Sequence, residues 1–128
     1  GQMIVFNQTS NAPKHVLRYR SRAYGNGYIV PKADRIVVGS TAEERGFTPQ
    51  LTGGGLFDIL RKAYAVVPDL HDWVVAETYT GLRPATDDRQ PLIVRHPELP
   101  IVHLNGLYRH GILLAPWAAE RVEELISG

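Results

Sequence analysis

The first half of the chain alternates between short apolar runs and clusters of turn-forming residues. Runs with apolar or alternating character, which predict strands, cover 2–6, 15–20, 27–31 and 35–40. Only three residues separate the last two runs, so we expect them to form a hairpin. This part of the sequence therefore predicts neighbouring strands joined by short connections.

A helical period begins after these strands. Apolar positions spaced by three or four residues occur at Leu56, Ile59, Leu60, Ala63 and Val67. Thr52 is the predicted cap of this helix, because a threonine hydroxyl can accept a hydrogen bond from an N–H group of the first turn. Pro68 marks its predicted end.

Strand patterns return at 73–80, 92–94 and 101–104, and a second helix closes the chain. Pro116 is predicted in the first turn of that helix, where a missing N–H group has no cost. The apolar stripe of the helix is predicted along Ala115, Ala118, Val122, Leu125 and Ile126. The order of elements predicts an α+β fold, with a mixed or antiparallel sheet covered by one or two helices.

Composition narrows the possible partners and compartments. The 128 residues suit one compact domain, and a net charge of +1 favours neither nucleic acid nor an anionic membrane as a partner. No stretch of eighteen apolar residues and no signal peptide is visible, so we expect a cytoplasmic protein. The chain has no cysteine, which excludes disulfides, thiolate metal sites and thiol catalysis.

Several common kinds of site find no support in the sequence. The five histidines include no pair with i,i+4 spacing on a helix, so we expect no metal site. Ser40 lacks the context of a hydrolase nucleophile. A phosphate-binding turn follows a strand and opens a helix. The glycine cluster at 25–27 precedes a strand rather than a helix, and the cluster at 53–55 opens a helix but does not follow a strand.

Arg83 is one candidate for ligand binding. It directly precedes Pro84, which favours an extended or turn conformation at Arg83. An arginine on a stiff connection can present its planar guanidinium to a carboxylate through two parallel hydrogen bonds. The alternative is a surface arginine paired with Asp87 or Asp88.

Arg109 is a second candidate, in the stretch "GLYRHGILLAP" that leads into the last helix. Gly106 and Gly111 leave the backbone around it unhindered, and the start of a helix offers free N–H groups and a partial positive charge. A cation beside a helix N-terminus predicts an anion site. The alternative is that the glycines serve only the turn and Arg109 is solvated. Tyr28 can likewise donate its hydroxyl to a ligand or pack as a half-buried strand residue.

Three segments together carry a resemblance to a known family. They are "YIVPKADRIVVGSTAEERGF", "GLRPATDD" and "YRHGILLAP", in this order. They resemble the C-terminal half of glycine oxidase, an FAD-dependent amine oxidase of the D-amino acid oxidase superfamily that is associated with bacterial thiamine biosynthesis. The resemblance covers nearly the whole chain and implies the substrate domain of that fold.

The resemblance also implies roles for individual residues. Arg83 and Tyr28 would bind the substrate carboxylate, Arg109 would lie beside substrate and flavin, and Ala42 stands where some relatives carry a larger side chain near the substrate. The backbone at the start of the last helix would face the flavin, through Gly106, Leu107, Tyr108, Arg109, His110, Gly111, Ile112 and Leu113. No residue of the chain is expected to act as a catalytic acid or base, because the cofactor carries the electron chemistry. Leu107 and His110 depart from the histidine and asparagine usual at their places.

The resemblance implies one domain with two portions. Residues up to about 80 would bind substrate, and those from about 81 to 128 would supply the flavin-facing strands and helix. The expected partners are a small amino acid or amine and an N-terminal FAD-binding region. Without that region we expect neither stable FAD binding nor activity. Self-association into homo-oligomers through the uncovered apolar faces is a second hypothesis.

A second interpretation is a non-catalytic module that binds a small carboxylate, or a partner chain, through Arg83 and Arg109. Within the superfamily, sarcosine oxidase and D-amino acid dehydrogenases are alternatives to glycine oxidase.

Overall fold

The computed structural model describes all of residues 1–128 and divides them into two compact units, Gly1–Leu82 and Arg83–Gly128. The first unit carries a five-stranded sheet and one long helix, whereas the second carries a two-stranded sheet and the last helix. The predicted α+β architecture, with antiparallel sheets and covering helices, is confirmed.

The sheet of the first unit is antiparallel throughout, with the strand order β2-β3-β4-β1-β5. The predicted hairpin is present as β3 and β4, closed by a hydrogen bond from Lys32 N to Arg35 O at 2.8 Å. The sequence did not predict that the late strand β5 pairs with β1. The strands are β1 (Gln2–Asn7), β2 (Leu17–Ser21), β3 (Gly25–Pro31), β4 (Arg35–Gly39) and β5 (Val75–Thr80).

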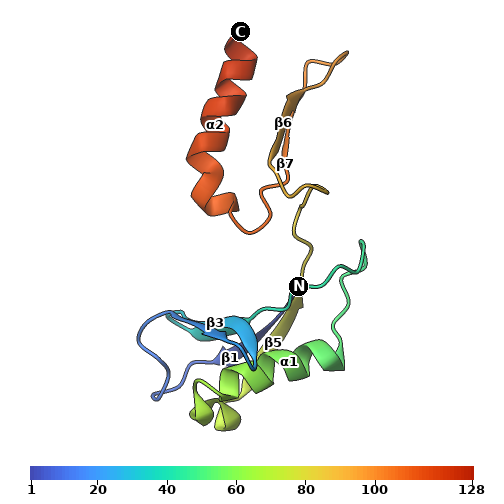
Figure 1. The fold of residues 1–128 in the computed structure, drawn as a ribbon. Helices are drawn as coiled ribbons and strands as arrows, with labels where there is room; N and C mark the ends of the chain where they lie inside the picture. Colours follow the sequence, from blue (N-terminus) through green and yellow to red (C-terminus); the bar gives the residue numbers. More distant parts are fainter. The chain divides into compact units, whose positions relative to one another are not determined.

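Helix α1 (Gly53–Tyr64) covers one face of this sheet (Figure 1). Thr52 caps it as predicted, because its hydroxyl accepts a hydrogen bond from Gly55 N at 3.1 Å. The predicted apolar stripe is buried or half-buried, whereas Phe57 on the other side is 67% exposed. Pro68 begins a short 3-10 helix, η1 (Pro68–Asp72), after α1 has ended.

The core lies between α1 and the facing side of the sheet. Alternate strand residues point to opposite faces, so every second residue of β1 and β4 reaches the helix. Trp73 closes this core after η1, with its ring edge-on to Phe6 at a centroid separation of 5.9 Å. The fully buried members are Ile4, Phe6, Ile29, Ile36, Val38, Ile59, Ala63 and Leu70.

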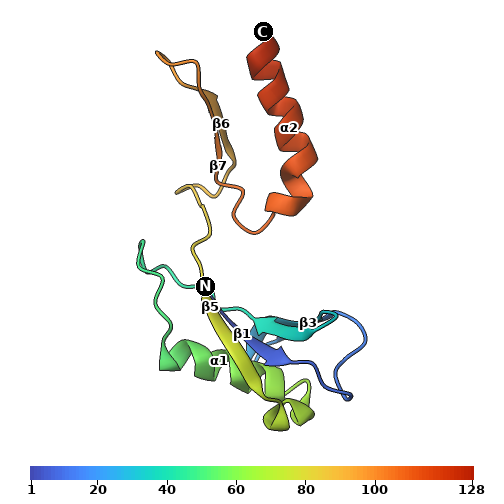
Figure 2. The same cartoon turned by 180° about the vertical axis from the view of Figure 1, so that it is seen from behind.

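The second unit is a hairpin packed against a helix. Strands β6 (Leu92–Arg95) and β7 (Val102–Asn105) pair antiparallel, and α2 (Gly111–Ser127) packs along both of them (Figure 2). Ala118 is buried at this contact, and the Arg95 guanidinium donates a hydrogen bond to Leu125 O at the far end. None of the helices combines the length and apolar character needed to cross a membrane.

The prediction for Pro116 was wrong. Helix α2 begins at Gly111, so Pro116 is the sixth residue of the helix and lies inside it. Residues 111–115, which precede the proline, are already helical. In this first turn Leu114 N donates a hydrogen bond to His110 O at 2.8 Å. A proline at this place leaves the carbonyl of Ile112 without its usual donor. The buried side of the helix, at Leu114, Ala118, Val122 and Leu125, shares three positions with the predicted stripe.

Candidate functional site

Tyr28 lies on the face of the first sheet opposite to α1. It pairs with Gly39 of β4, which in turn pairs with Met3 of β1. The Tyr28 hydroxyl donates a hydrogen bond to the sulfur of Met3 at 3.1 Å, and the side chain is half-buried. Because a thioether is a weak acceptor, this hydroxyl keeps most of its capacity to bind a stronger acceptor.

Gly39 provides the space through which Tyr28 reaches Met3. A Cβ atom at Gly39 would lie 2.9 Å from the Tyr28 hydroxyl and 3.0 Å from Met3 Cγ, which is closer than real Cβ contacts. The absence of a side chain in the middle strand therefore fixes the direction of the tyrosine. Sequence reasoning identified Tyr28 but missed Met3 and Gly39, because a strand pattern does not show which residues pair.

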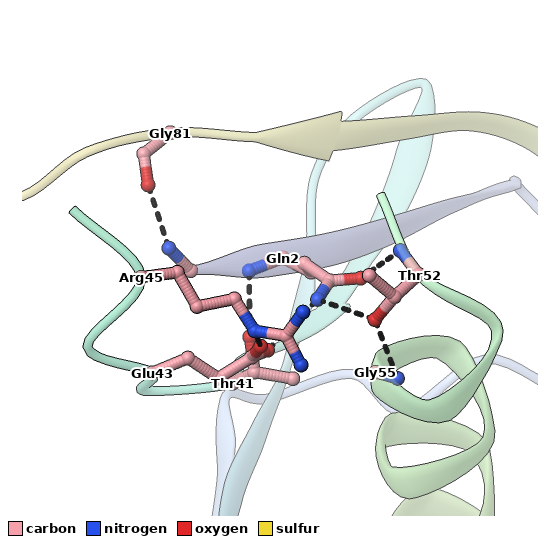
Figure 3. Close-up of polar contacts among 8 residues, drawn as sticks. Gln2, Thr41, Glu43, Arg45, Thr52, Gly55 and Gly81 are labelled. Atoms are coloured by element: carbon pink, nitrogen blue, oxygen red, sulfur yellow. Dashed lines mark hydrogen bonds and ion pairs between the residues drawn. The ribbon is translucent and has the colours of Figure 1, made fainter. Parts of the chain in front are cut away.

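Ala42 follows β4 and is exposed, whereas its two neighbours are bound to Gln2 (Figure 3). The backbone N–H of Gln2 donates to Thr41 Oγ1 at 2.9 Å, and Thr41 N donates to Gln2 O at 3.2 Å. On the other side of Ala42, Gln2 Nε2 donates to Glu43 Oε1 at 2.8 Å. The backbone at Ala42 is therefore held from both directions.

The same glutamine contacts the start of α1. Gln2 Nε2 donates to Thr52 Oγ1 at 3.1 Å, and Thr52 N donates to Gln2 Oε1 at 2.9 Å. Gln2 is only 3% exposed, and a Cβ atom at Gly55 would overlap its amide. Both donors and the acceptor of a buried side chain are thus satisfied, as burial of a polar group requires.

The Glu43 carboxylate is stabilised in its charged form. The hydrogen bond from the Thr41 hydroxyl is the largest cause that lowers the pKa of Glu43, and the bond from Gln2 and the nearby Arg45 add to it. Arg45 also forms an ion pair with Glu43. The turn after β4 is therefore organised around a carboxylate that carries a charge at neutral pH.

In the second unit, a backbone hydrogen bond joins the loop after Arg83 to the stretch before α2. Tyr108 N donates to Pro84 O at 3.0 Å, so Arg83 and Arg109 each adjoin one partner of the same bond. Arg83 is half-buried and Arg109 is exposed, with its guanidinium 5.1 Å from the ring centroid of Tyr108. The chain neighbours of the two predicted arginines are thus joined by one main-chain hydrogen bond.

Gly106 allows this junction to form. It is buried with a φ of +76°, and a Cβ atom there would lie 2.9 Å from Gln90 O and 3.0 Å from Thr86 Cγ2. The adjacent loop is held by Thr86 Oγ1, which donates to Gln90 O at 2.6 Å, and by Asp88, whose carboxylate accepts from Gln90 N at 3.0 Å. Only glycine combines this φ with so close an approach.

The start of α2 presents bare backbone. No side chain caps the helix, and its first N–H groups have no partner within the helix. Ile112 and Leu113 in the first turn are 98% and 75% exposed. An uncapped helix start combines N–H donors with a partial positive charge, while these apolar side chains suit a flat aromatic group. These features fit the edge of a flavin.

Comparison with known proteins identifies the family. The family described as "FAD dependent oxidoreductase" matches residues 1–125. The chain belongs to this family.

Relatives within the FAD dependent oxidoreductase family agree with the resemblance to glycine oxidase. The chain is 37% identical to the bifunctional protein ThiO/ThiG of Trichormus variabilis, over 98% of this chain and 19% of that protein. It is 37% identical to the glycine oxidase of Bacillus licheniformis, over 85% of this chain and 30% of that protein. The chain therefore spans less than a third of either relative.

A solved structure confirms the fold. The glycine oxidase from Bacillus cereus matches with a TM-score of 0.83 at 28% identity, covering 100% of this chain and 35% of that one. The predicted resemblance and the D-amino acid oxidase-like fold are both confirmed.

Proposed function

We propose that this chain is the substrate-binding and flavin-facing part of an FAD-dependent amino acid oxidase of the glycine oxidase type. The observation that carries the proposal is the hydrogen bond between Pro84 and Tyr108, which joins the loop of Arg83 to Arg109 at the uncapped start of α2. The names of the relatives support the choice of glycine or another small amino acid as substrate.

In this proposal the substrate is held by its carboxylate. Arg83 donates two parallel hydrogen bonds, and the Tyr28 hydroxyl exchanges its weak acceptor, Met3, for a carboxylate oxygen. Arg109 adds a second positive charge beside the substrate. Ala42 borders the substrate side chain and, because it is small, leaves room there. These contacts orient the α-carbon, and no residue of the chain is assigned as an acid or base.

The backbone from Gly106 to Leu113 is assigned to the flavin. When bound, FAD would supply the two-electron oxidation of the substrate amine, with dioxygen as the final electron acceptor and a 2-oxo acid, ammonia and hydrogen peroxide as the products after hydrolysis. The N–H groups of Gly111, Ile112 and Leu113 would stabilise negative charge at the pyrimidine edge of the cofactor. The uncapped helix start supports this role, because a capping side chain would occupy those donors.

The partner in this proposal is the FAD-binding region of the complete protein. The chain covers 35% or less of the relatives described above, and its second unit exposes large apolar side chains. Such surfaces are usually covered by another part of a protein. They belong to β6, β7 and α2, and include Leu92, Val94, Leu104, Ile112, Leu113 and Ile126. Light scattering of the 128-residue chain across concentrations would detect self-association through the same surface.

The test is to change Arg83 in the FAD-containing oxidase that includes this segment. Arg83→Ala should raise the KM for glycine strongly, since it removes a charge-assisted pair of roughly 2–5 kcal/mol. Arg83→Lys should also be impaired, because an ammonium cannot present two parallel donors. The exposed Arg22 gives a matched control, and Arg22→Ala should leave the KM unchanged.

Two outcomes would contradict the proposal. An unchanged KM for Arg83→Ala would mean that the carboxylate is bound elsewhere. Carboxylate binding without turnover in the FAD-containing protein would instead favour a non-catalytic binding module.

A further inference from the structure

The loop 43–52 is fastened at both ends to a single side chain. Glu43 at its beginning and Thr52 at its end both form hydrogen bonds with the amide of Gln2. Between these two residues the chain forms no helix or strand and is exposed throughout. Figure 3 shows the amide of Gln2 between the two loop ends. The two ends of this loop are therefore held together by one buried side chain.

Gln2 also controls the residue just before this loop. Thr41 exchanges two hydrogen bonds with the backbone of Gln2, and its hydroxyl donates to Glu43. Ala42 therefore lies between two residues that are bound both to Gln2 and to each other. A change in the Gln2 amide reaches Ala42 through Glu43 alone, because the Thr41 bonds use the backbone of Gln2 and do not depend on its side chain.

The fit between Gln2 and α1 leaves no room for adjustment. The amide occupies the space that a side chain at Gly55 would need, and Thr52 Oγ1 uses its remaining capacity on Gly55 N. The Gln2 amide is consequently fixed by its contacts with Thr52 and Gly55. A change in the amide is therefore expected to displace Glu43 rather than the start of α1. This arrangement is rigid in the way that residues supporting a binding site must be.

We propose that Gln2 is a positioning residue that sets the place of Ala42 and of the loop 43–52, and so the size of substrate side chain that is accepted. This inference rests on the proposed function, in which Ala42 borders the substrate. Gln2 itself touches neither substrate nor cofactor in this proposal.

The experiment compares charge-exchange variants in the FAD-containing oxidase. Gln2→Glu keeps the shape of the side chain but places a second carboxylate against Glu43, so the loop base should open. The preference for glycine over D-alanine, measured as the ratio of kcat/KM values, should fall about tenfold. Most of the change should appear in KM, and the flavin absorption spectrum should stay the same.

Restoring the donor and acceptor pair should restore the preference. In the double variant Gln2→Glu with Glu43→Gln, the amide at position 43 can donate to the carboxylate at position 2. The ratio should then return to within about twofold of the original value. Gln8→Glu makes the same chemical change at an exposed position and is the matched control. It should leave the ratio unchanged.

The outcomes separate this inference from the proposed function. If Ala42→Leu alters the glycine preference while Gln2→Glu and the double variant do not, the inference is wrong and the role of Ala42 remains. If Ala42→Leu has no effect either, the proposed function is at fault. If Gln2→Glu does not fold, Glu43→Leu alone provides the test, since it removes the oxygen that accepts from Gln2 Nε2. An unchanged preference in that variant overturns the inference.

Discussion

The hydroxyl of Tyr28 reaches across strand β4 to the sulfur of Met3, and the residue it crosses is Gly39. Three neighbouring strands thus cooperate to direct one phenol group. The arrangement depends on the missing side chain of the middle residue, because a Cβ atom there would contact both partners.

Replacing Gly39 by alanine should therefore displace Tyr28. We expect a loss of roughly 1–3 kcal/mol in the free energy of unfolding of the 128-residue chain, measured with urea, because the added methyl group overpacks the contact. In the FAD-containing oxidase the KM for glycine should rise as well. Gly54→Ala is the control, since a Cβ atom at Gly54 meets nothing within 4 Å. A Gly39→Ala variant with unchanged stability and KM would show that the tyrosine does not depend on this glycine.

The phenol of Tyr19 should make stability fall at high pH. Burial, and then the negative charge of Asp58, raise the pKa of Tyr19 from 10.0 to about 12. Between these two values the folded chain keeps a proton that the unfolded chain has lost. Stability is therefore lost as pH rises from about 10 to about 12. Urea unfolding across this range should show the loss, and Tyr19→Phe should reduce its slope. An equally steep slope in the variant would assign the loss to another group.

Local sequence patterns predicted the first unit well where the determining contacts are near in sequence. Thr52 caps α1, and the stripe beginning at Leu56 is buried, because both features depend on residues within a few positions. The β3–β4 hairpin was predicted for the same reason. The pairing of β1 with β5 joins residues 69 to 78 positions apart, and no local pattern encodes it.

The candidate site divides in the same way. Arg83 and Arg109 were found from their neighbours, a proline and two glycines. Gln2 was missed, because its side-chain partners lie 41 and 50 residues away and a glutamine at a strand start has no distinctive pattern. The one signal was the glycine cluster at 53–55, whose last member admits the Gln2 amide. The prediction for Pro116 was wrong because prolines in helices are most common in the first turn, whereas α2 begins five residues before Pro116.

The Glu43 carboxylate should make stability depend on pH at the acid end. Its pKa is lowered from 4.5 in the folded chain, chiefly by the Thr41 hydroxyl. The stabilisation is therefore complete above the unfolded value and is lost as pH falls through the lower folded value. Glu43→Gln should remove part of the decrease in unfolding free energy below about pH 4.5. The same change at the exposed Glu120 is the control. A decrease that is identical in Glu43→Gln and in the original chain would contradict this role.

The indole of Trp73 tests how much of the core depends on ring packing. Its Nε1–H group is buried and has no hydrogen-bond partner, while its ring packs edge-on against Phe6. Trp73→Phe removes the unpaired donor and keeps an aromatic ring, so we expect a cost below about 1.5 kcal/mol. Trp73→Ala should cost roughly 3–5 kcal/mol, because it leaves a cavity. Urea unfolding of the two variants provides the comparison, and equal costs would mean that a phenyl ring does not replace the packing of the indole against Phe6.

Gly106 should be the least replaceable residue of the second unit. Alanine there meets two penalties, a φ of +76° and a Cβ atom 2.9 Å from the carbonyl oxygen of Gln90. The backbone has little freedom to relieve them, because Tyr108 N is bound to Pro84 O two residues later. We expect Gly106→Ala to lower the free energy of unfolding of the 128-residue chain by about 2 kcal/mol or more. Gly111→Ala is the control for stability, since a Cβ atom at Gly111 meets nothing within 4 Å.

In the FAD-containing oxidase, Gly106→Ala should also lose flavin during gel filtration, because the N–H groups before α2 would shift. If the variant keeps its flavin while its stability falls, Gly106 serves the fold of the second unit and the flavin is held by other residues.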